Sequence, residues 1–107
     1  MLTDRSRQLI QDADQRLVSS ISISEIEIKR SIAKLTIPDS YLEKIIESGF
    51  DELPFDFEDA FGLRSLPLHH NDSFDRMLIS QAAVKGLTIL ANDTSFRRYN
   101  IPVVLNE

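Results

Sequence analysis

The stretch DSFDRMLISQAAVKGLTILA, residues 72–91, joins a helix pattern directly to a strand pattern. Its first apolar residues recur at the spacing of one helix face, namely Phe74, Met77, Leu78 and Ala82. Gly86 is typical of the position just after a helix ends. LTILA (87–91) is then continuously apolar, as a strand is when helices cover both faces of a parallel sheet. The stretch therefore predicts a helix packed on a buried strand.

The rest of the chain repeats this alternation. Helices are predicted at residues 3–13, 26–35, 38–49 and 55–63, and strands at residues 16–21 and 101–105. Thr3 is the expected N-cap of the first helix, and in the helix of 38–49 we expect Leu42, Ile45 and Ile46 to face inward. The order predicts a single three-layer α/β/α domain over residues 1–107 with a mainly parallel central sheet.

Composition limits the classes of function. The 107 residues carry a net charge of -5, are 42% hydrophobic and include no cysteine, so disulfides, thiolate catalysis and cysteine-based zinc sites are excluded. No apolar run is long enough for a membrane helix and no signal peptide is evident, so we expect a cytoplasmic globular protein. The negative charge argues against binding nucleic acid by bulk attraction alone.

Three acidic residues fall where predicted strands end or helices begin. Glu25 lies at the junction between the strand RLVSSI and the next helix, Asp75 lies at the start of the helix in 72–91, and Asp93 follows LTILAN. In open parallel sheets, sites form outside the carboxyl ends of the strands. Carboxylates brought together there repel one another unless a cation lies between them, and oxygen ligands suit Mg²⁺ or Mn²⁺. The pattern favours a metal site.

Each acid also has a purely structural interpretation. Glu25 stands at capping-box spacing from Ser22, Asp75 stands at the same spacing from Asp72, and Asp93 fits an ordinary turn. His69 and His70 are neighbours, so in an extended segment at most one of them faces a given site. Taken singly, the structural interpretation is favoured; taken together, the three acids favour a shared site.

Three blocks of the sequence resemble a known family. They are VSSISISEIEIKRSIAKL (18–35), LPLHHNDSFDRMLISQA (66–82) and GLTILANDTSFRRYNIPVV (86–104). They resemble PIN domains, and specifically the VapC-type ribonuclease toxins of bacterial toxin-antitoxin pairs. The middle block nearly reproduces the family pattern LPxHHxDPFDRxLIAQA, with Ser73 where proline is usual.

The resemblance implies a metal-dependent endoribonuclease. Glu25, Asp75 and Asp93 match the family's metal-binding acids and would hold Mg²⁺ or Mn²⁺, directly or through water, for hydrolysis of RNA. Asp72 would be an N-cap. Arg76 would orient carboxylate or phosphate, although an exposed helix arginine is the simpler interpretation. The implied partners are RNA, a cognate antitoxin protein and a second copy of the chain. An alternative is a non-catalytic PIN remnant that binds an antitoxin or dimerises.

One departure concerns the N-terminal end. Members of this family begin with an apolar strand that leads into an aspartate ligand, as in LLDTH, whereas this sequence opens with MLTDRSRQLI, which matches a later segment. We therefore expect the first strand and the first catalytic aspartate to be missing. One carboxylate fewer would lower metal affinity and activity.

Overall fold

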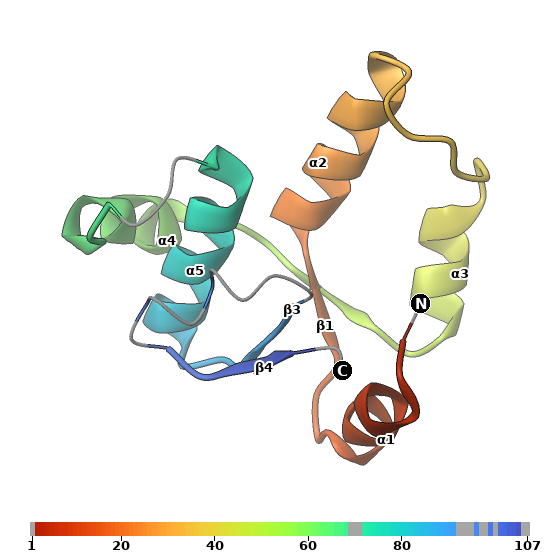
Figure 1. The fold of residues 1–107 in the computed structure, drawn as a ribbon, viewed down its shortest axis with the longest axis horizontal. Coiled ribbons are helices and arrows are strands. Elements are labelled where there is room, and N and C mark those ends of the chain that lie inside the picture. Colours follow the sequence, from red (N-terminus) through yellow and green to blue (C-terminus); the bar gives the residue numbers. More distant parts are fainter. Residues whose placement is uncertain (1, 69–71, 92–95, 97–98, 100, 106–107) are drawn as a thin grey trace. The chain divides into compact units, whose positions relative to one another are not determined.

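The computed structural model describes residues 2–68, 72–91, 96, 99 and 101–105. The chain divides into two compact units: unit 1 is residues 1–13 with 55–107, and unit 2 is residues 14–54. Unit 1 contains α1 (Asp4–Asp12), α4 (Phe57–Phe61), the 3₁₀ helix η1 (Gly62–Ser65), α5 (Ser73–Lys85), β3 (Ile89–Ala91) and β4 (Val103–Leu105). Unit 2 contains β1 (Leu17–Ser19), α2 (Ser20–Ser31), α3 (Tyr41–Glu47) and β2 (Asp51–Leu53). Figure 1 shows these elements along the chain. The single-domain assignment stays a prediction.

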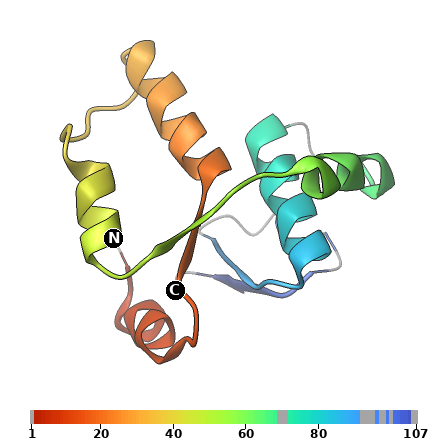
Figure 2. The same ribbon diagram turned by 180° about the vertical axis from the view of Figure 1, so that it is seen from behind.

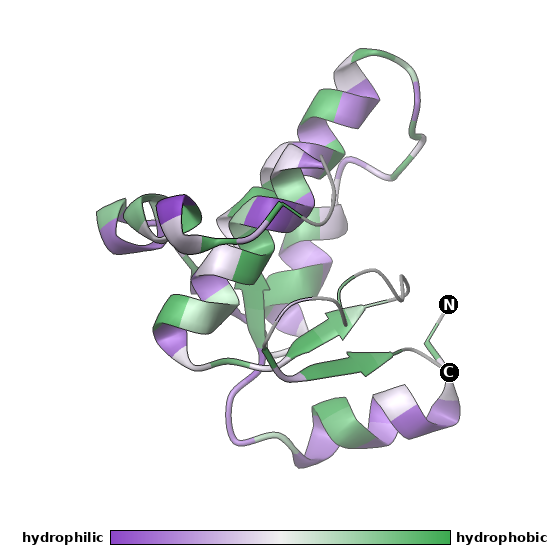
Figure 3. Ribbon diagram, turned by 60° about the vertical axis from the view of Figure 1, so that its left-hand side comes forward, coloured by the Kyte–Doolittle hydropathy of each residue, from purple (hydrophilic) through white to green (hydrophobic). Residues whose placement is uncertain are grey.

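Unit 1 is built on the parallel pair β3–β4, in which Ile89 lies opposite Val103. Both strands are hydrophobic, and in Figure 3 they lie between α5 and α1. The core consists of the buried Ile79, Phe96 and Tyr99, with Leu66, Ile89, Ala91, Ile101 and Val103 packed against it. The prediction of parallel strands and covering helices is confirmed here.

The buried face of α5 differs from the predicted stripe. Ile79, Ser80, Gln81 and Ala82 are its buried residues, whereas Phe74, Met77 and Leu78 are only half-buried. Figures 1 and 2 both show α4 beside α5, and these two helices contact each other directly. Because α5 packs on α4 and η1 as well as on strands, it buries more than one face, and a single apolar stripe cannot describe it.

A glycine allows the close approach of these helices. A Cβ atom at Gly62 would lie 2.7 Å from the Ser80 Oγ and 2.9 Å from a Val84 methyl group. The Ser80 hydroxyl also donates a hydrogen bond of 2.6 Å to the Asp59 carbonyl oxygen. These contacts fix α4 on α5 and determine which face of α4 points away from the core.

Unit 2 holds a second parallel pair, β1–β2, with Leu17 opposite Asp51. The predicted strand at 16–21 is too long, because the chain becomes helical at Ser20. The Ser19 side chain accepts a hydrogen bond from the Ile21 N–H and caps this helix. The period-2 pattern of isoleucines suggested a strand, but this cap favours a helix. The partner strand β2 was not predicted, and it offers only three residues for pairing.

The predicted inward face of α3 is only partly correct. Gly49 follows the helix with φ of 88°, as predicted from its position. Ile45 is half-buried, whereas Leu42 is exposed and Ile46 has 62% of its surface exposed. These apolar side chains line an open groove rather than a closed core, as described below.

No described helix has the length and apolarity that crossing a membrane requires.

Candidate metal site

Glu25 lies within α2, in unit 2. The strand-to-helix junction is at Ser19 and Ser20, so Glu25 occupies the second helical turn, and the predicted capping box with Ser22 is wrong because Ser19 is the cap. One Glu25 carboxylate oxygen lies 2.8 Å from Lys29 Nζ, one turn along the helix, and 24% of the Glu25 side chain is exposed. An exposed ion pair at this spacing is worth only about 0.5 kcal/mol, so a divalent cation could compete for this carboxylate.

Asp75 lies in the first turn of α5, in unit 1. Its backbone N–H donates a hydrogen bond of 3.0 Å to Asp72 Oδ1, which confirms Asp72 as the N-cap. The Asp75 side chain is half-buried. Asp72 therefore supplies the N-cap, and Asp75 lies in the first helical turn, where the positive end of the helix dipole attracts negative charge.

Asp93, His69 and His70 lie outside the described residues. Asp93 follows the last residue of β3, Ala91, by two positions. Glu25 and Asp75 belong to different units, so the meeting of the three acids stays a prediction. Among the residues that the structure describes, no three His, Cys, Asp or Glu side chains are grouped as a metal site. The donor atoms of all three candidates are carboxylate oxygens, which fits Mg²⁺ or Mn²⁺.

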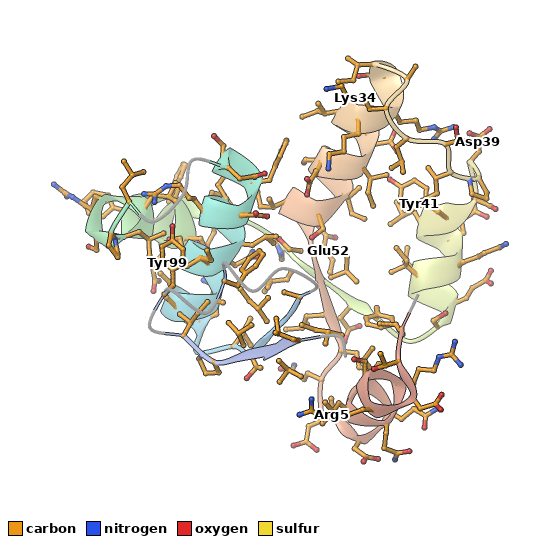
Figure 4. The ribbon with its side chains drawn as sticks, viewed as in Figure 1. Arg5, Lys34, Asp39, Tyr41, Glu52 and Tyr99 are labelled. Carbon is orange, nitrogen blue, oxygen red and sulfur yellow. The ribbon has the colours of Figure 1, made fainter. Side chains whose placement is uncertain are left out.

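Arg76 has a defined structural role. Its Nη1 donates hydrogen bonds to the Pro67 carbonyl oxygen at 3.0 Å and to the Tyr99 hydroxyl at 3.4 Å. Tyr99 is buried beside α5 (Figure 4). Arg76 thereby ties the segment before α5 and the segment after β3 to the helical turn that carries Asp75. The sequence pattern did not distinguish this role from contact with carboxylate or phosphate.

A buried carboxylate in unit 1 was not predicted. Asp59 has no exposed surface, and it forms a reciprocal capping box with Asp56 at the start of α4. Lys85 Nζ lies 2.7 Å from Asp56 Oδ2 and 3.4 Å from Asp59 Oδ1. The Asp56-x-x-Asp59 spacing was visible in the sequence, but its link to Lys85 depends on how α4 packs on α5.

This ion pair predicts a pH effect on stability. The hydrogen bond from Lys85 lowers the pKa of Asp56, and the same bond raises the pKa of Lys85. The contribution of Asp56 to the free energy of unfolding is therefore complete above the pKa that Asp56 has in the unfolded chain, about 3.9. This contribution is lost as pH falls through the lower pKa of Asp56 in the folded protein. The contribution of Lys85 to the free energy of unfolding is complete below the pKa that Lys85 has in the unfolded chain, about 10.4. This contribution is lost as pH rises through the higher pKa of Lys85 in the folded protein.

Asp56→Asn keeps a capping side chain but removes the charge. We expect the difference in free energy of unfolding between the wild type and this variant to be constant near neutral pH and to shrink in acid. Urea denaturation across the pH range measures it, with the exposed Asp14→Asn as the matched charge control. A difference that does not change in acid would contradict the assigned ion pair.

Unit 2 also contains an apolar groove of about 360 Å³. It is lined by Val18, Ser20, Ile23, Ser24, Leu42, Ile45, Ile46, Phe50, Asp51 and Glu52.

Two polar contacts join α2 to the start of α3. The Tyr41 hydroxyl donates a hydrogen bond of 2.7 Å to Glu27, and Arg30 forms an ion pair with Asp39. Asp39 and Tyr41 are labelled near the start of α3 in Figure 4. The bond to Glu27 raises the pKa of Tyr41. These contacts tie α2 to the start of α3.

Comparison with known families identifies the fold. A model of the PIN domain family matches residues 2–102. The chain belongs to the PIN domain family. The match covers both units of this PIN domain and includes the positions of Glu25, Asp75 and Asp93. A comparison with curated proteins found no match.

Two solved structures resemble this PIN domain over most of its length. One is VapBC2 from Rickettsia felis bound to a DNA fragment from its promoter, with a TM-score of 0.74 and 16% identity, covering 98% of this chain and 87% of that chain. The other is DNA-bound VapBC from Salmonella typhimurium, with a TM-score of 0.66 and 19% identity, covering 92% and 81%. At these identities the likeness shows a shared fold, and the predicted α/β class is confirmed.

Proposed function

We propose that this PIN domain is a VapC-like endoribonuclease, the toxin of a type II toxin-antitoxin pair, which hydrolyses RNA phosphodiesters with Mg²⁺ or Mn²⁺ in the cytoplasm. The observation that carries the proposal is the family match over residues 2–102 together with Asp75 in the first turn of α5. The likeness in fold to two VapBC structures supports the choice of VapC within the family.

The topology of unit 1 supports the pairing of Asp75 with Asp93. The chain runs along α5, reverses at Gly86 in the left-handed conformation and returns along β3. The first turn of α5 and the residues after β3 are therefore expected at the same end of the unit. The Arg76–Tyr99 hydrogen bond supports this, because it links the start of α5 to the segment that follows β3.

The roles of the residues follow from their chemistry. When bound, Mg²⁺ supplies a Lewis acid that stabilises charge developing on the scissile phosphodiester. Asp75, with Glu25 and Asp93, would hold the ion through carboxylate oxygens. Arg76 keeps the turn that carries Asp75 in place through its bonds to Pro67 and Tyr99. Lys29 would neutralise Glu25 until a cation replaces it.

Two measurements on the full chain test the proposal. Calorimetric titration with Mg²⁺ or Mn²⁺ should show metal binding, and the variants Glu25→Gln and Asp75→Asn should weaken it. A single-stranded RNA should be cut only when the metal is present and no chelator is added. Glu27→Gln, on the same helix as Glu25, is the matched control. Absence of metal binding in the wild type would exclude the metal-dependent nuclease and leave the alternative function, that of a non-catalytic PIN remnant that binds an antitoxin or dimerises.

That alternative has its own support in the apolar groove of unit 2. We infer that a cognate antitoxin docks there with the apolar side of a helix. The groove exposes Leu42 and Ile46 and has acidic residues, Asp51 and Glu52, in its lining. An occupant with an apolar face and a basic side chain would complement both features. This docking could accompany the nuclease activity or exist without it.

Ile46→Lys tests the groove. It places a charge among apolar lining residues, so we expect affinity for the cognate antitoxin to fall at least roughly tenfold, which corresponds to about 1.4 kcal/mol. The control is Ile32→Lys, because Ile32 is also exposed but does not line the groove. Isothermal titration with purified antitoxin measures both. Equal affinities for the two variants would exclude this groove as the docking site.

A further inference from the structure

Three segments of unit 1 meet at one guanidinium group. Arg76 follows Asp75 at the start of α5, and its side chain is half-buried. Its Nη1 donates hydrogen bonds to the Pro67 carbonyl oxygen at 3.0 Å and to the Tyr99 hydroxyl at 3.4 Å. One nitrogen serves both acceptors because Nη1 carries two N–H groups. Pro67 precedes α5 and Tyr99 follows β3, so this side chain joins segments that are far apart in the sequence.

The tyrosine end of this link is fixed in the core of unit 1. Tyr99 has only 4% of its surface exposed, and it packs with Ile79 and Phe96 beside α5 (Figure 4). Its backbone N–H donates to the Phe96 carbonyl oxygen at 3.3 Å, and its carbonyl oxygen accepts from the Ile101 N–H at 2.9 Å. A buried tyrosine usually gives its hydroxyl a hydrogen-bond partner. The ring is therefore held, and its hydroxyl is a defined acceptor for Arg76.

The proline end of the link is anchored to the same core. Leu66, the neighbour of Pro67, packs against the core, and its N–H donates a hydrogen bond of 3.2 Å to the Leu63 carbonyl oxygen. A free arginine side chain has many rotamers, and ordering it costs conformational entropy. Because both acceptors are attached to the core, the guanidinium is held at two points. The helical turn from which Arg76 projects is held with it.

We infer that Tyr99 is a positioning residue for the metal site, an inference that rests on the proposed binding of Mg²⁺ or Mn²⁺ by Asp75. Tyr99 acts through Arg76, which holds the turn that carries Asp75. Within this turn, the Asp75 and Arg76 N–H groups bond only to Asp72, through its Oδ1 and its carbonyl oxygen, each at 3.0 Å. Residues that orient a metal ligand without touching the metal change metal affinity, because they keep the ligand in its productive geometry.

The same geometry favours a positioning role for Arg76 over contact with phosphate. Its Nη1 is committed to the Pro67 carbonyl oxygen and the Tyr99 hydroxyl, which leaves fewer N–H groups for RNA. Arg76→Lys keeps the charge but loses the planar, fixed donors of the guanidinium. This variant should therefore weaken metal binding and leave the KM for RNA, measured at saturating metal, unchanged. A raised KM with unchanged metal affinity would instead indicate contact with phosphate and would overturn the inference.

Tyr99→Phe is the main test, because it removes one oxygen atom and keeps the ring in the core. Isothermal titration of the full chain with Mn²⁺ should show a dissociation constant raised about threefold to tenfold, less than the 10–100-fold typical of groups that bond a metal ligand directly. Tyr41→Phe is the matched control. It removes a hydroxyl that donates a hydrogen bond of 2.7 Å to Glu27 in unit 2, and it should leave metal affinity unchanged.

Amide hydrogen exchange gives a second measurement that needs no metal. In the presence of a chelator, the Asp75 and Arg76 amides of Tyr99→Phe should exchange about threefold faster than in the wild type, because the first turn of α5 opens locally more often. Amides of residues 82–85, at the other end of α5, are the internal reference and should be unaffected. An equal increase along the whole helix would show only a general loss of stability and would overturn the inference.

A double variant tests whether Tyr99 acts through Arg76. In the Arg76→Lys background, Tyr99→Phe should weaken metal binding little further, because the link is already broken. Fully additive losses would overturn the inference, as would a Tyr99→Phe variant with wild-type metal affinity. A wild type that binds no metal would overturn the nuclease proposal and this inference together. Metal binding in the wild type with no effect of Tyr99→Phe would overturn this inference alone.

Discussion

Asp75→Asn is expected to reduce metal-dependent RNA cleavage by roughly 100-fold or more, because neutralising a proposed direct ligand should cost at least as much as the 10–100-fold typical of outer-shell changes. The substitution keeps the size of the side chain and leaves the backbone N–H bond to Asp72 in place. Stability should therefore change little. Initial rates of cleavage of a labelled RNA, measured at increasing Mg²⁺ concentration, give the result.

Asp72→Asn is the matched control for this experiment. It removes the same charge from the same helix start, but asparagine caps a helix about as well as aspartate. We expect this variant to keep most of the wild-type rate. If both variants lose activity equally, the effect comes from the charge at the start of α5 and not from a ligand at Asp75.

Ile79→Ala should lower the free energy of unfolding by about 3 kcal/mol, within the usual range for deleting a buried isoleucine. Ile79 has no exposed surface, and it packs with Phe96 and Tyr99 in the core of unit 1. Domains of this size are stable by only about 5–15 kcal/mol, so the loss is large. Because Ile79 lies one turn after Asp75, metal affinity should fall as well.

Urea denaturation measures this loss, with Ile32→Ala as the control. Ile32 is mostly exposed at the end of α2, and surface substitutions usually change stability by less than about 0.5 kcal/mol. A similar small change for Ile79→Ala would show that the core of unit 1 is not centred on this residue.

Prediction from the sequence was most accurate where local chemistry decides the conformation. The ends of α5 were predicted correctly because Asp72 accepts the N-cap hydrogen bond and Gly86 adopts a positive φ. Thr3 caps α1 for the same reason. The start of α2 was misplaced, because alternating isoleucines suit a strand while the Ser19 hydroxyl caps a helix six residues earlier than the predicted start. Two local signals conflicted there.

The candidate site could be predicted only as a set of residues. Glu25, Asp75 and Asp93 were selected by residue type and by motif, and the family match covers all three positions. Their convergence stays a prediction, because it depends on contacts between distant parts of the chain. Asp59 shows the same limit, since its burial and its link to Lys85 exist only once α4 packs on α5.

By itself, the sequence determined the N-cap of α1, both ends of α5, the apolar strands β3 and β4 and the kinds of side chain available for chemistry. Caps, glycines and short apolar runs act through neighbouring residues. Only the tertiary structure decided that Ile79 is the centre of a core, that Arg76 bonds to Tyr99, and that Phe57 and Phe61 face solvent. Burial depends on which other element covers a face, and local sequence does not contain that information.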